Sequence, residues 1–379
     1  MKIRYFDHAA TTPVNRDVLK EMLPYFCEEF GNASALYGMG KKNKEIINLS
    51  RMKIAQILNC KANEIYFTSG GTESDNLIIK GIALANKRRG NHIITSKIEH
   101  PAVINSCRFL ESIGFTVTYL DVDERGIIDL NQLERHINRN TILISIMFAN
   151  NEIGTIQPIR EIAEIAGRYN IYFHTDAVQA FGNVKIDIEK LNIDALSLSG
   201  HKFYGPKGVG IVYIKENVPF IRMEDGGHQE KEKRAGTENV PGIVGIARAA
   251  EIAENNFNEY NKKIKYLRDY YFWQVENRIS DIKINGDRKL RLSGNANICF
   301  AGIDGAKLLA RLDERGICAS SGSACSAGLI ASSYVLLAIG VPKNLTYGSL
   351  RVTFGSENEI EDVEFLVDNL QEIIEQLRN

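Results

Sequence analysis

The run Thr141-Ile142-Leu143-Ile144-Ser145-Ile146-Met147 decides the fold, because it is apolar or β-branched almost without interruption. Such a run suits a strand of a sheet that is covered on both faces, as parallel sheets are. Similar runs recur along the chain, separated by helical stretches such as those over about 72–88 and 102–112. The other runs are 64–68, 92–96, 116–120, 171–174, 195–198 and 208–214. This alternation predicts an α/β fold with an open, mostly parallel sheet and helices on both sides.

The chain is long enough for two domains. Its 379 residues exceed what one hydrophobic core usually organises. A long helical region over about 243–279 follows the alternating part, and the residues 359–377 have the pattern of an amphipathic helix. We therefore predict a large domain over 15–259 and a smaller α/β domain formed by 1–14 together with 260–379.

Composition and charge narrow the classes of partner. The chain is 44% hydrophobic and 25% charged, and its formal net charge is -1. Proteins that bind nucleic acids or anionic membranes usually carry a concentrated positive charge. This chain has no net positive charge, so neither is expected as a direct partner. The N-terminus lacks the apolar segment of a signal peptide, and no stretch approaches the ~20 apolar residues of a membrane span. These features predict a cytoplasmic protein.

A glycine turn between a strand and a helix predicts an anion site. The segment Thr68-Ser69-Gly70-Gly71-Thr72-Glu73-Ser74 leads from a strand through two glycines into a helix. Glycines let the backbone approach an anion, and the free N–H groups at a helix start favour negative charge. Gly71 and Thr72 are therefore candidates for holding a phosphate. The alternative is an ordinary turn in which Thr72 or Ser74 caps the helix.

An aspartate at a strand end is a second candidate, because ligands of open parallel sheets bind at the carboxyl ends of the strands. Asp176 follows the run 171–174, and Gln179 comes three residues later. A buried carboxylate needs a partner, and a pyridinium N–H would supply one while keeping the ring an electron sink. The alternative for Asp176 is a helix N-cap.

A lysine and two histidines complete the constellation. Lys202 lies in Ser197-Leu198-Ser199-Gly200-His201-Lys202, directly after a hydrophobic strand. A lone lysine is usually solvated, but hydroxyl, imidazole and amine groups around one point favour an amine that forms a Schiff base. His100 follows another strand and is placed to stack on a flat ring; the alternative is that it caps the next helix or lies in a loop. Together these residues predict a pyridoxal phosphate (PLP) site.

Several motifs together carry a resemblance to a known family. The chain resembles the NifS/IscS-type cysteine desulfurases, in the class V aminotransferase group of fold-type I PLP-dependent enzymes, over essentially its whole length. The resemblance implies the fold-type I architecture, with PLP bound by the large domain, L-cysteine as substrate and a homodimer. The motifs are Tyr5-Phe6-Asp7-His8-Ala9-Ala10-Thr11-Thr12-Pro13, Thr72-Glu73-Ser74-Asp75-Asn76, Asn150-Asn151-Glu152-Ile153-Gly154 and Ser199-Gly200-His201-Lys202 with Tyr204-Gly205-Pro206-Lys207-Gly208.

The resemblance also implies how the cofactor is held. Lys202 forms the Schiff base and is catalytic together with His100, which stacks on the ring. Asp176 binds the pyridinium nitrogen, and Gln179 reaches the phenolic oxygen. The phosphate is held by Gly71, Thr72, Ser199 and His201 of one subunit and by Thr237, which reaches the site of the partner subunit.

For the substrate, the resemblance implies that Asn151 and Arg351 bind the carboxylate, with Asn151 also beside the cofactor. Arg351 lies in Ser349-Leu350-Arg351-Val352. The forked donors of a guanidinium match the two oxygens of a carboxylate, which gives this arginine a mechanical reason for the role.

Cys325 sets the reaction. It lies among small residues, in Ala319-Ser320-Ser321-Gly322-Ser323-Ala324-Cys325-Ser326-Ala327-Gly328, which is typical of an exposed loop in the small domain. We predict that its thiolate attacks the sulfur of L-cysteine, so that alanine leaves and a persulfide stays on Cys325. The resemblance implies transfer of this sulfur to an iron–sulfur scaffold or other acceptor, including tRNA thiolation. No intrinsic metal is expected. At most, Cys325 would be a transient ligand of an iron–sulfur cluster.

The other cysteines are expected to be small buried hydrophobes: Cys27, Cys60, Cys107, Cys299 and Cys318. The chain departs from the family at Leu329-Ile330-Ala331-Ser332, where relatives often have Leu-Glu-Pro-Ser. This difference bears on loop stiffness or recognition of the acceptor.

Two alternatives stay open. In the first, the chain is another PLP enzyme of this group, such as a selenocysteine lyase or an aminotransferase, and Cys325 is incidental. In the second, the chain is a non-catalytic partner in sulfur assembly. A metalloenzyme is disfavoured, since the histidines and cysteines show no ligand spacing.

Overall fold

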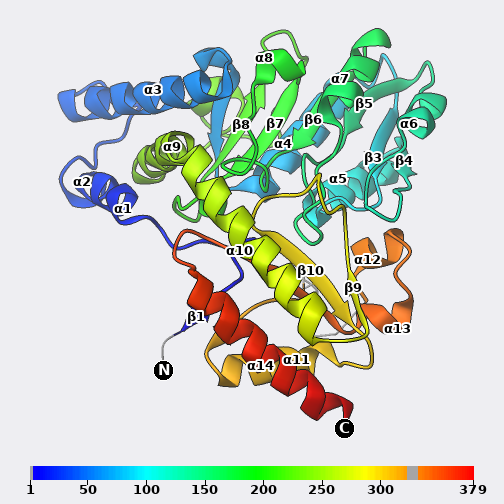
Figure 1. The fold of residues 1–379 in the computed structure, drawn as a ribbon. Coiled ribbons are helices and arrows are strands. Elements are labelled where there is room, and N and C mark those ends of the chain that lie inside the picture. Colours follow the sequence, from blue (N-terminus) through cyan, green and yellow to red (C-terminus); the bar gives the residue numbers. More distant parts are fainter. Residues whose placement is uncertain (1–2, 322–331) are drawn as a thin grey trace.

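The computed structural model describes residues 3–321 and 332–379, and its largest element is a seven-stranded sheet (Figure 1). The strand order in this sheet is β2-β8-β7-β6-β5-β3-β4. All of its strands except β4 are buried along their whole length or nearly so, as expected for a sheet covered on both faces. The strands are β2 (Ile65–Thr68), β3 (His92–Ser96), β4 (Thr116–Leu120), β5 (Thr141–Ser145), β6 (Tyr172–Asp176), β7 (Ala195–Ser199) and β8 (Gly210–Ile214).

The sheet is mostly parallel, which confirms the predicted α/β class. Neighbouring strands from β4 to β7 are parallel, whereas β8 runs antiparallel to both β7 and β2. The physical reason lies in the connection: β7 and β8 are joined by residues 200–209 alone. A parallel partner would need a crossover of a dozen or more residues, usually a helix. Lys202 lies in this short connection, so the turn that makes β8 antiparallel also places Lys202.

Alternate residues of the strands enter two different cores. Phe67, Ile144 and Leu196 pack with α1, α3, α7 and α9 on one face of the sheet. Tyr66 and Leu143, one residue away along their strands, pack with α4 and α5 on the other face. This period of two is the geometry of a strand whose side chains point alternately to opposite faces.

A second, three-stranded antiparallel sheet is built by the C-terminal part of the chain. Its strand order is β12 (Ser349–Thr353), β10 (Asn295–Phe300) and β9 (Ile282–Ile284). It shares a core with α10, α11 and α14; in Figure 1, α11 and α14 lie below the larger sheet, and α10 runs down toward them. Phe6 from the N-terminal segment joins this core, and β1 (Arg4–Tyr5) pairs in parallel with β11 (Ile317–Cys318).

The predicted domain boundary after residue 259 falls inside α10 (Phe257–Arg278), and we retain the two-domain division as a proposal. The helical region expected over 243–279 is two helices, which meet at Asn256. The remaining helices are α1 (Arg16–Met22), α2 (Pro24–Cys27), α3 (Gly38–Leu58), α4 (Gly71–Ala85), α5 (Pro101–Ser112), α6 (Leu130–His136), α7 (Ile159–Arg168), α8 (Ile188–Leu191), α9 (Val240–Asn255), α11 (Gly305–Glu314), α12 (Tyr334–Ala338), α13 (Lys343–Thr346) and α14 (Ile360–Arg378).

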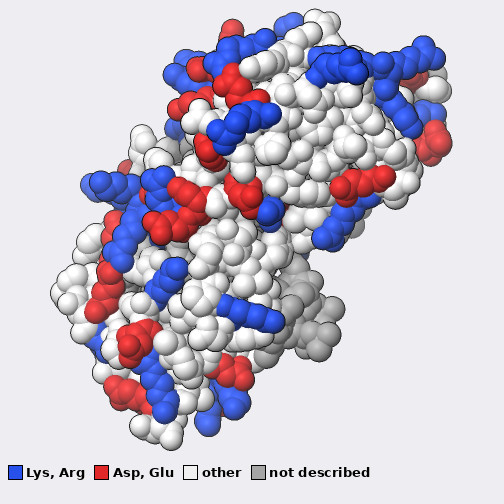
Figure 2. All heavy atoms as spheres, turned by 90° about the vertical axis from the view of Figure 1, so that its right-hand side faces the viewer, with Lys and Arg blue, Asp and Glu red and all other residues white. Residues whose placement is uncertain are grey.

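Charges of both signs share the surface. On the face seen in Figure 2, Lys and Arg side chains lie among Asp and Glu side chains, as the formal net charge of -1 suggests. Among the described residues, no helix is both long enough and apolar enough to cross a membrane.

Candidate active site

A cavity of about 300 Å³ opens where the strands of the large sheet end. It brings together all but two of the predicted site residues, catalytic and binding residues taken together. Thr237 lies outside it and is exposed on the segment that precedes α9, and Cys325 lies outside the described residues. The predicted residues that line the cavity are Gly71, Thr72, His100, Asn151, Asp176, Gln179, Ser199, His201, Lys202 and Arg351.

The glycine turn before α4 forms a narrow cradle. Gly70 has a φ of 153°, a conformation that L side chains rarely adopt. A Cβ on Gly71 would lie 2.8 Å from Val178 Cγ2, too close for any larger residue. The Ser74 hydroxyl donates to the Gly70 carbonyl oxygen (2.9 Å), and no side chain caps the described first turn of α4. The capping alternative for Thr72 and Ser74 is therefore wrong.

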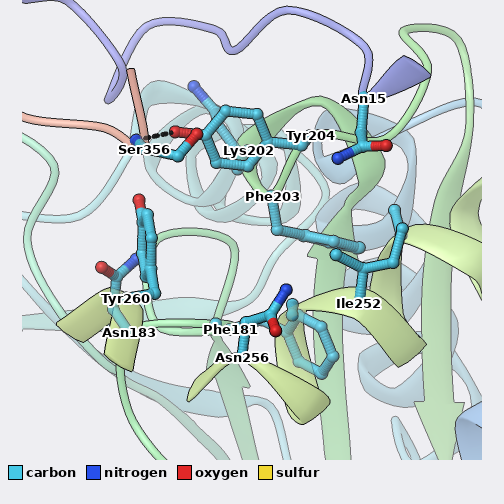
Figure 3. A pocket seen from close by; sticks show the side chains of 13 residues that line it. Asn15, Phe181, Asn183, Lys202, Phe203, Tyr204, Ile252, Asn256, Tyr260 and Ser356 are labelled. Atoms are coloured by element: carbon cyan, nitrogen blue, oxygen red, sulfur yellow. Dashed lines mark hydrogen bonds between the residues drawn. The ribbon is translucent and has the colours of Figure 1, made fainter. Parts of the chain in front are cut away.

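Lys202 ends a short 3₁₀ helix (Gly200–Lys202), and its amine faces the N-terminal segment. The Nζ atom donates to the carbonyl oxygens of Ala9 (2.6 Å) and Ala10 (2.8 Å). The next residue, Phe203, packs against Phe181, with 4.6 Å between the ring centroids. Figure 3 shows these rings in a second, smaller hollow, away from which the Lys202 side chain extends.

The N-terminal segment is part of the site, a role that sequence reasoning did not assign. The Gln179 amide donates to the Ala9 carbonyl oxygen (2.9 Å), and the Thr11 hydroxyl bonds His201 Nδ1 (3.0 Å). Ala9 and Ala10 also line the cavity. The available signal was a run of small residues, Ala9-Ala10, which leaves room for a close approach of backbone and side chains.

Asp176 ends β6 inside the cavity and is buried. Its carboxylate accepts a hydrogen bond from the backbone N–H of Val178 (2.9 Å). This contact resembles the predicted N-cap, but no helix begins directly after Asp176. Burial raises the pKa of Asp176, while the charges of His100 and Lys202 oppose the rise. Asp75, which we did not predict, also lines the cavity, and burial and the charge of Asp176 raise its pKa.

His100 is the capping histidine of its predicted alternative, and its stacking role stays a prediction. It is the N-cap of α5, where Nδ1 accepts from the Ala102 N–H (3.1 Å), and it also lines the cavity. Burial lowers the pKa of His100 despite the opposing charge of Asp176. Burial, aided by Lys202 and Lys207, lowers the pKa of His201 to about 4. Both imidazoles are therefore neutral near pH 7.

Arg351, on β12, reaches the cavity from the smaller sheet. Its guanidinium donates from Nη1 to the carbonyl oxygen of Asn151 (3.0 Å) and from Nη2 to Asp7 Oδ1 (2.7 Å). The backbone of Arg351 also bonds Ser320 in both directions. Ser333 donates to Glu152 (2.6 Å), beside Asn151. The residues that flank 322–331 are therefore attached at the rim of the cavity.

The described cysteines correct one expectation. Cys107 and Cys299 are buried as predicted, and Cys60 and Cys318 are half-buried. Cys27 is exposed, so the prediction for it was wrong: α2 is a single turn with no buried residue. Within the described part of the chain, no group of three or more His, Cys, Asp or Glu side chains is placed to hold a metal ion.

Both the fold and the site define a class of protein. The family model of class-V aminotransferases matches residues 4–366, and the chain belongs to this family. The cysteine desulfurase IscS of Clostridium botulinum is 51% identical over 99% of this chain and 95% of its own length. A solved NifS-like protein superimposes with a TM-score of 0.94, at 38% identity over 99% of this chain and 100% of its own. The solved structure of "SspA in complex with cysteine" is 40% identical over 93% of this chain and 99% of its own, with a TM-score of 0.83.

The cofactor of this family is PLP, and the donor set of the cavity fits it. The cradle at Gly71 has space only for a residue without a Cβ, and it lies at the start of a helix, where free N–H groups favour a phosphate. Asp176 offers a buried carboxylate, and Lys202 offers the amine. The predicted fold class and cofactor are thereby confirmed, whereas the role of each single residue stays a prediction.

Proposed function

We propose that this chain is a PLP-dependent cysteine desulfurase that converts L-cysteine to L-alanine and retains the sulfur on Cys325. One observation carries the proposal: a single cavity joins Lys202, Asp176 and His100 from the large sheet to Arg351 from the smaller one. The first three groups suit the cofactor, and Arg351 suits an amino-acid carboxylate. The similarity to cysteine desulfurases over nearly the whole chain supports cysteine as that amino acid.

The residues of the cavity divide the work. The phosphate would be held by Gly71, Thr72, Ser199 and His201. Asp176 and Gln179 would bind the polar atoms of the ring, and His100 would stack on its face. When bound, PLP withdraws electrons from the Cα of the amino acid, which makes the Cα proton acidic. The Lys202 amine would move that proton, because it lies in the same cavity and is held by two carbonyl oxygens.

Arg351 and Asn151 would bind the substrate carboxylate and so place its thiol. The Cys325 thiolate then attacks the substrate sulfur: an S–S bond forms, the C–S bond breaks, and the carbon is protonated and leaves as alanine. Attachment of Ser320 to Arg351 and of Ser333 to Glu152 supports this step, since it holds both flanks of the cysteine segment beside the carboxylate site.

Partners and location belong to the same proposal. We infer a cytoplasmic homodimer in which Thr237 reaches the phosphate in the partner subunit, since Thr237 is exposed and outside its own cavity. The persulfide would pass to an iron–sulfur scaffold or another acceptor, including the enzymes of tRNA thiolation. Cys325 would touch iron only as a transient ligand during that transfer.

Replacing Cys325 tests the reaction. Cys325→Ala should keep the absorbance of the bound cofactor and lose at least about 10²-fold in sulfide release from L-cysteine with a thiol reductant, because the nucleophile is absent. Cys27→Ala, which removes an exposed cysteine far along the chain, is the matched control and should stay near wild type.

The same assay separates the alternatives. An aminotransferase would convert amino donor and keto acid pairs and release no sulfide, and a selenocysteine lyase would prefer L-selenocysteine. A non-catalytic partner would purify colourless. Unchanged sulfide release by Cys325→Ala would refute the assignment.

A further inference from the structure

The guanidinium of Arg351 is held by two contacts that come from different parts of the chain. Nη2 donates to Asp7 Oδ1 (2.7 Å), and Nη1 donates to the carbonyl oxygen of Asn151 (3.0 Å). Nε is buried without a hydrogen-bond partner. The Arg351 side chain is 5% exposed, so its charge is largely removed from water. Asp7 is the carboxylate that pairs with it among the described residues.

Asp7 is itself firmly placed. It forms an isolated parallel bridge with Thr353, two residues along β12 from Arg351, and Thr353 N donates to the Phe6 carbonyl oxygen (2.7 Å). The Tyr5 hydroxyl bonds the carbonyl oxygens of Asp7 (3.0 Å) and Thr11 (2.9 Å), which closes the turn that follows. The carboxylate is therefore delivered to Arg351 by backbone pairing and by a closed turn.

We propose that Asp7 is a positioning residue for substrate recognition: it orients the Arg351 fork toward the cavity so that the fork receives an amino-acid carboxylate. This inference rests on the proposed function for the identity of the substrate. Asp7 does not line the cavity, so it acts through Arg351 and not by contact with the amino acid.

The physical basis is the freedom of an arginine side chain. Recognition of a carboxylate by two parallel N–H···O bonds requires the guanidinium plane to be fixed. Asn151 supplies a neutral carbonyl oxygen, which restrains one end of the fork. Asp7 restrains the other end by a charge-assisted bond, which is shorter and stronger than a neutral one. Without Asp7 the fork turns about its remaining contact, and the carboxylate loses one of its two bonds.

The test compares two ligands of the PLP-loaded enzyme that differ in their carboxylate. L-alanine carries the carboxylate and L-alaninamide does not, and the binding of each is followed by the change in cofactor absorbance. Asp7→Ala should weaken binding of L-alanine by about tenfold and leave that of L-alaninamide within about twofold of wild type. Asp7→Asn keeps an oxygen at the same place and should restore binding of L-alanine to within about threefold.

A matched control comes from the same N-terminal segment. Arg4 Nε bonds Asp362 Oδ1 (3.1 Å) outside the cavity, and Asp362→Ala should affect neither ligand. If Asp7→Ala yields no folded holoenzyme, Asp7→Ser takes its place, because a serine hydroxyl is too short to reach Arg351.

Three results would overturn the inference: L-alanine binding as tightly to Asp7→Ala as to wild type, equal weakening of both ligands, or a wild-type enzyme that does not discriminate between them. Sulfide release from L-cysteine is measured separately. Absent sulfide with the Asp7 effect intact would refute the desulfurase function and leave the positioning role standing for another amino acid.

Discussion

At the scale of single residues, carboxyl groups that are withdrawn from water lie in the cavity and beside it. Asp75, Glu99 and Asp176 are all buried, and burial raises the pKa of each. Glu99 is the clearest case: its pKa rises to about 8 even though Met147 N–H and the Ser96 hydroxyl donate to it. A low-dielectric surrounding that already contains Asp176 opposes a second negative charge.

Glu99 should make stability depend on pH. The folded protein holds the Glu99 proton up to about pH 8, whereas an unfolded glutamate releases it near pH 4.3. The folded state thus binds more protons between these values, so the stability contributed by this group is full below about pH 4.3 and is lost as pH rises toward 8. Relative to Glu99→Gln, the wild type should lose up to about 1.4 kcal/mol of unfolding free energy per pH unit in this window.

Denaturant unfolding of the two proteins at several pH values measures this difference. Parallel stability curves for wild type and Glu99→Gln would show that the carboxyl titrates alike in both states, contrary to this account.

Sequence reasoning reached the residues that follow strand ends. Asp176 and Lys202 were predictable because a buried strand leads directly into each, and the structure places both in one cavity. Asp7 and Asp75 were not, because their place depends on contacts across the chain: Asp7 meets a residue 344 positions away. The spacing of residues along the sequence does not predict a contact between two side chains so far apart.

At the scale of elements, the segment before α9 is held in an unusual conformation. Glu230, Lys231 and Glu232 have φ values of 43°, 55° and 66°, a left-handed region that costs energy for such residues. A buried ion pair holds the segment: Arg51, on α3, donates from both terminal nitrogens to Glu230 (2.8 Å each). Glu230 also accepts from the Phe67 N–H on β2 (2.9 Å).

Loss of this pair should be costly. Arg51→Met leaves the Glu230 carboxylate buried without its cation, and we expect a loss of about 3–5 kcal/mol in the free energy of unfolding. The matched control is Arg315→Met. Arg315 makes an equally forked pair with Glu372 on the surface, and its loss should cost no more than about 1 kcal/mol.

Both variants are compared with wild type by denaturant unfolding. Equal losses for Arg51→Met and Arg315→Met would mean that burial adds nothing to the Arg51–Glu230 pair.

Elements with strong periodicity were the predictable ones. The strands of the large sheet lie within a few residues of their expected ranges. The direction of β8 was not predictable from its apolar run, because the run alone does not say whether the chain returns by a crossover or a short turn. The break at Asn256 was missed because apolar and charged residues continue at helical spacing through it.

At the scale of the whole molecule, the site is made where two cores meet. The large sheet supplies the groups suited to the cofactor, the smaller sheet supplies Arg351, and the N-terminal segment contacts both. The segment reaches the smaller core through Phe6 and the cavity through Ala9 and Ala10. Neither sheet alone contains a complete site for an amino acid and its cofactor.

The central claim is that this cavity delivers sulfur from L-cysteine to Cys325. Mass spectrometry of the PLP-loaded protein after incubation with L-cysteine, without reductant, tests it most directly. We predict that the peptide containing Cys325 gains the mass of one sulfur atom, that a thiol reductant removes this mass, and that L-alanine appears in equal amount. An unmodified Cys325 in protein that has consumed L-cysteine would contradict the account.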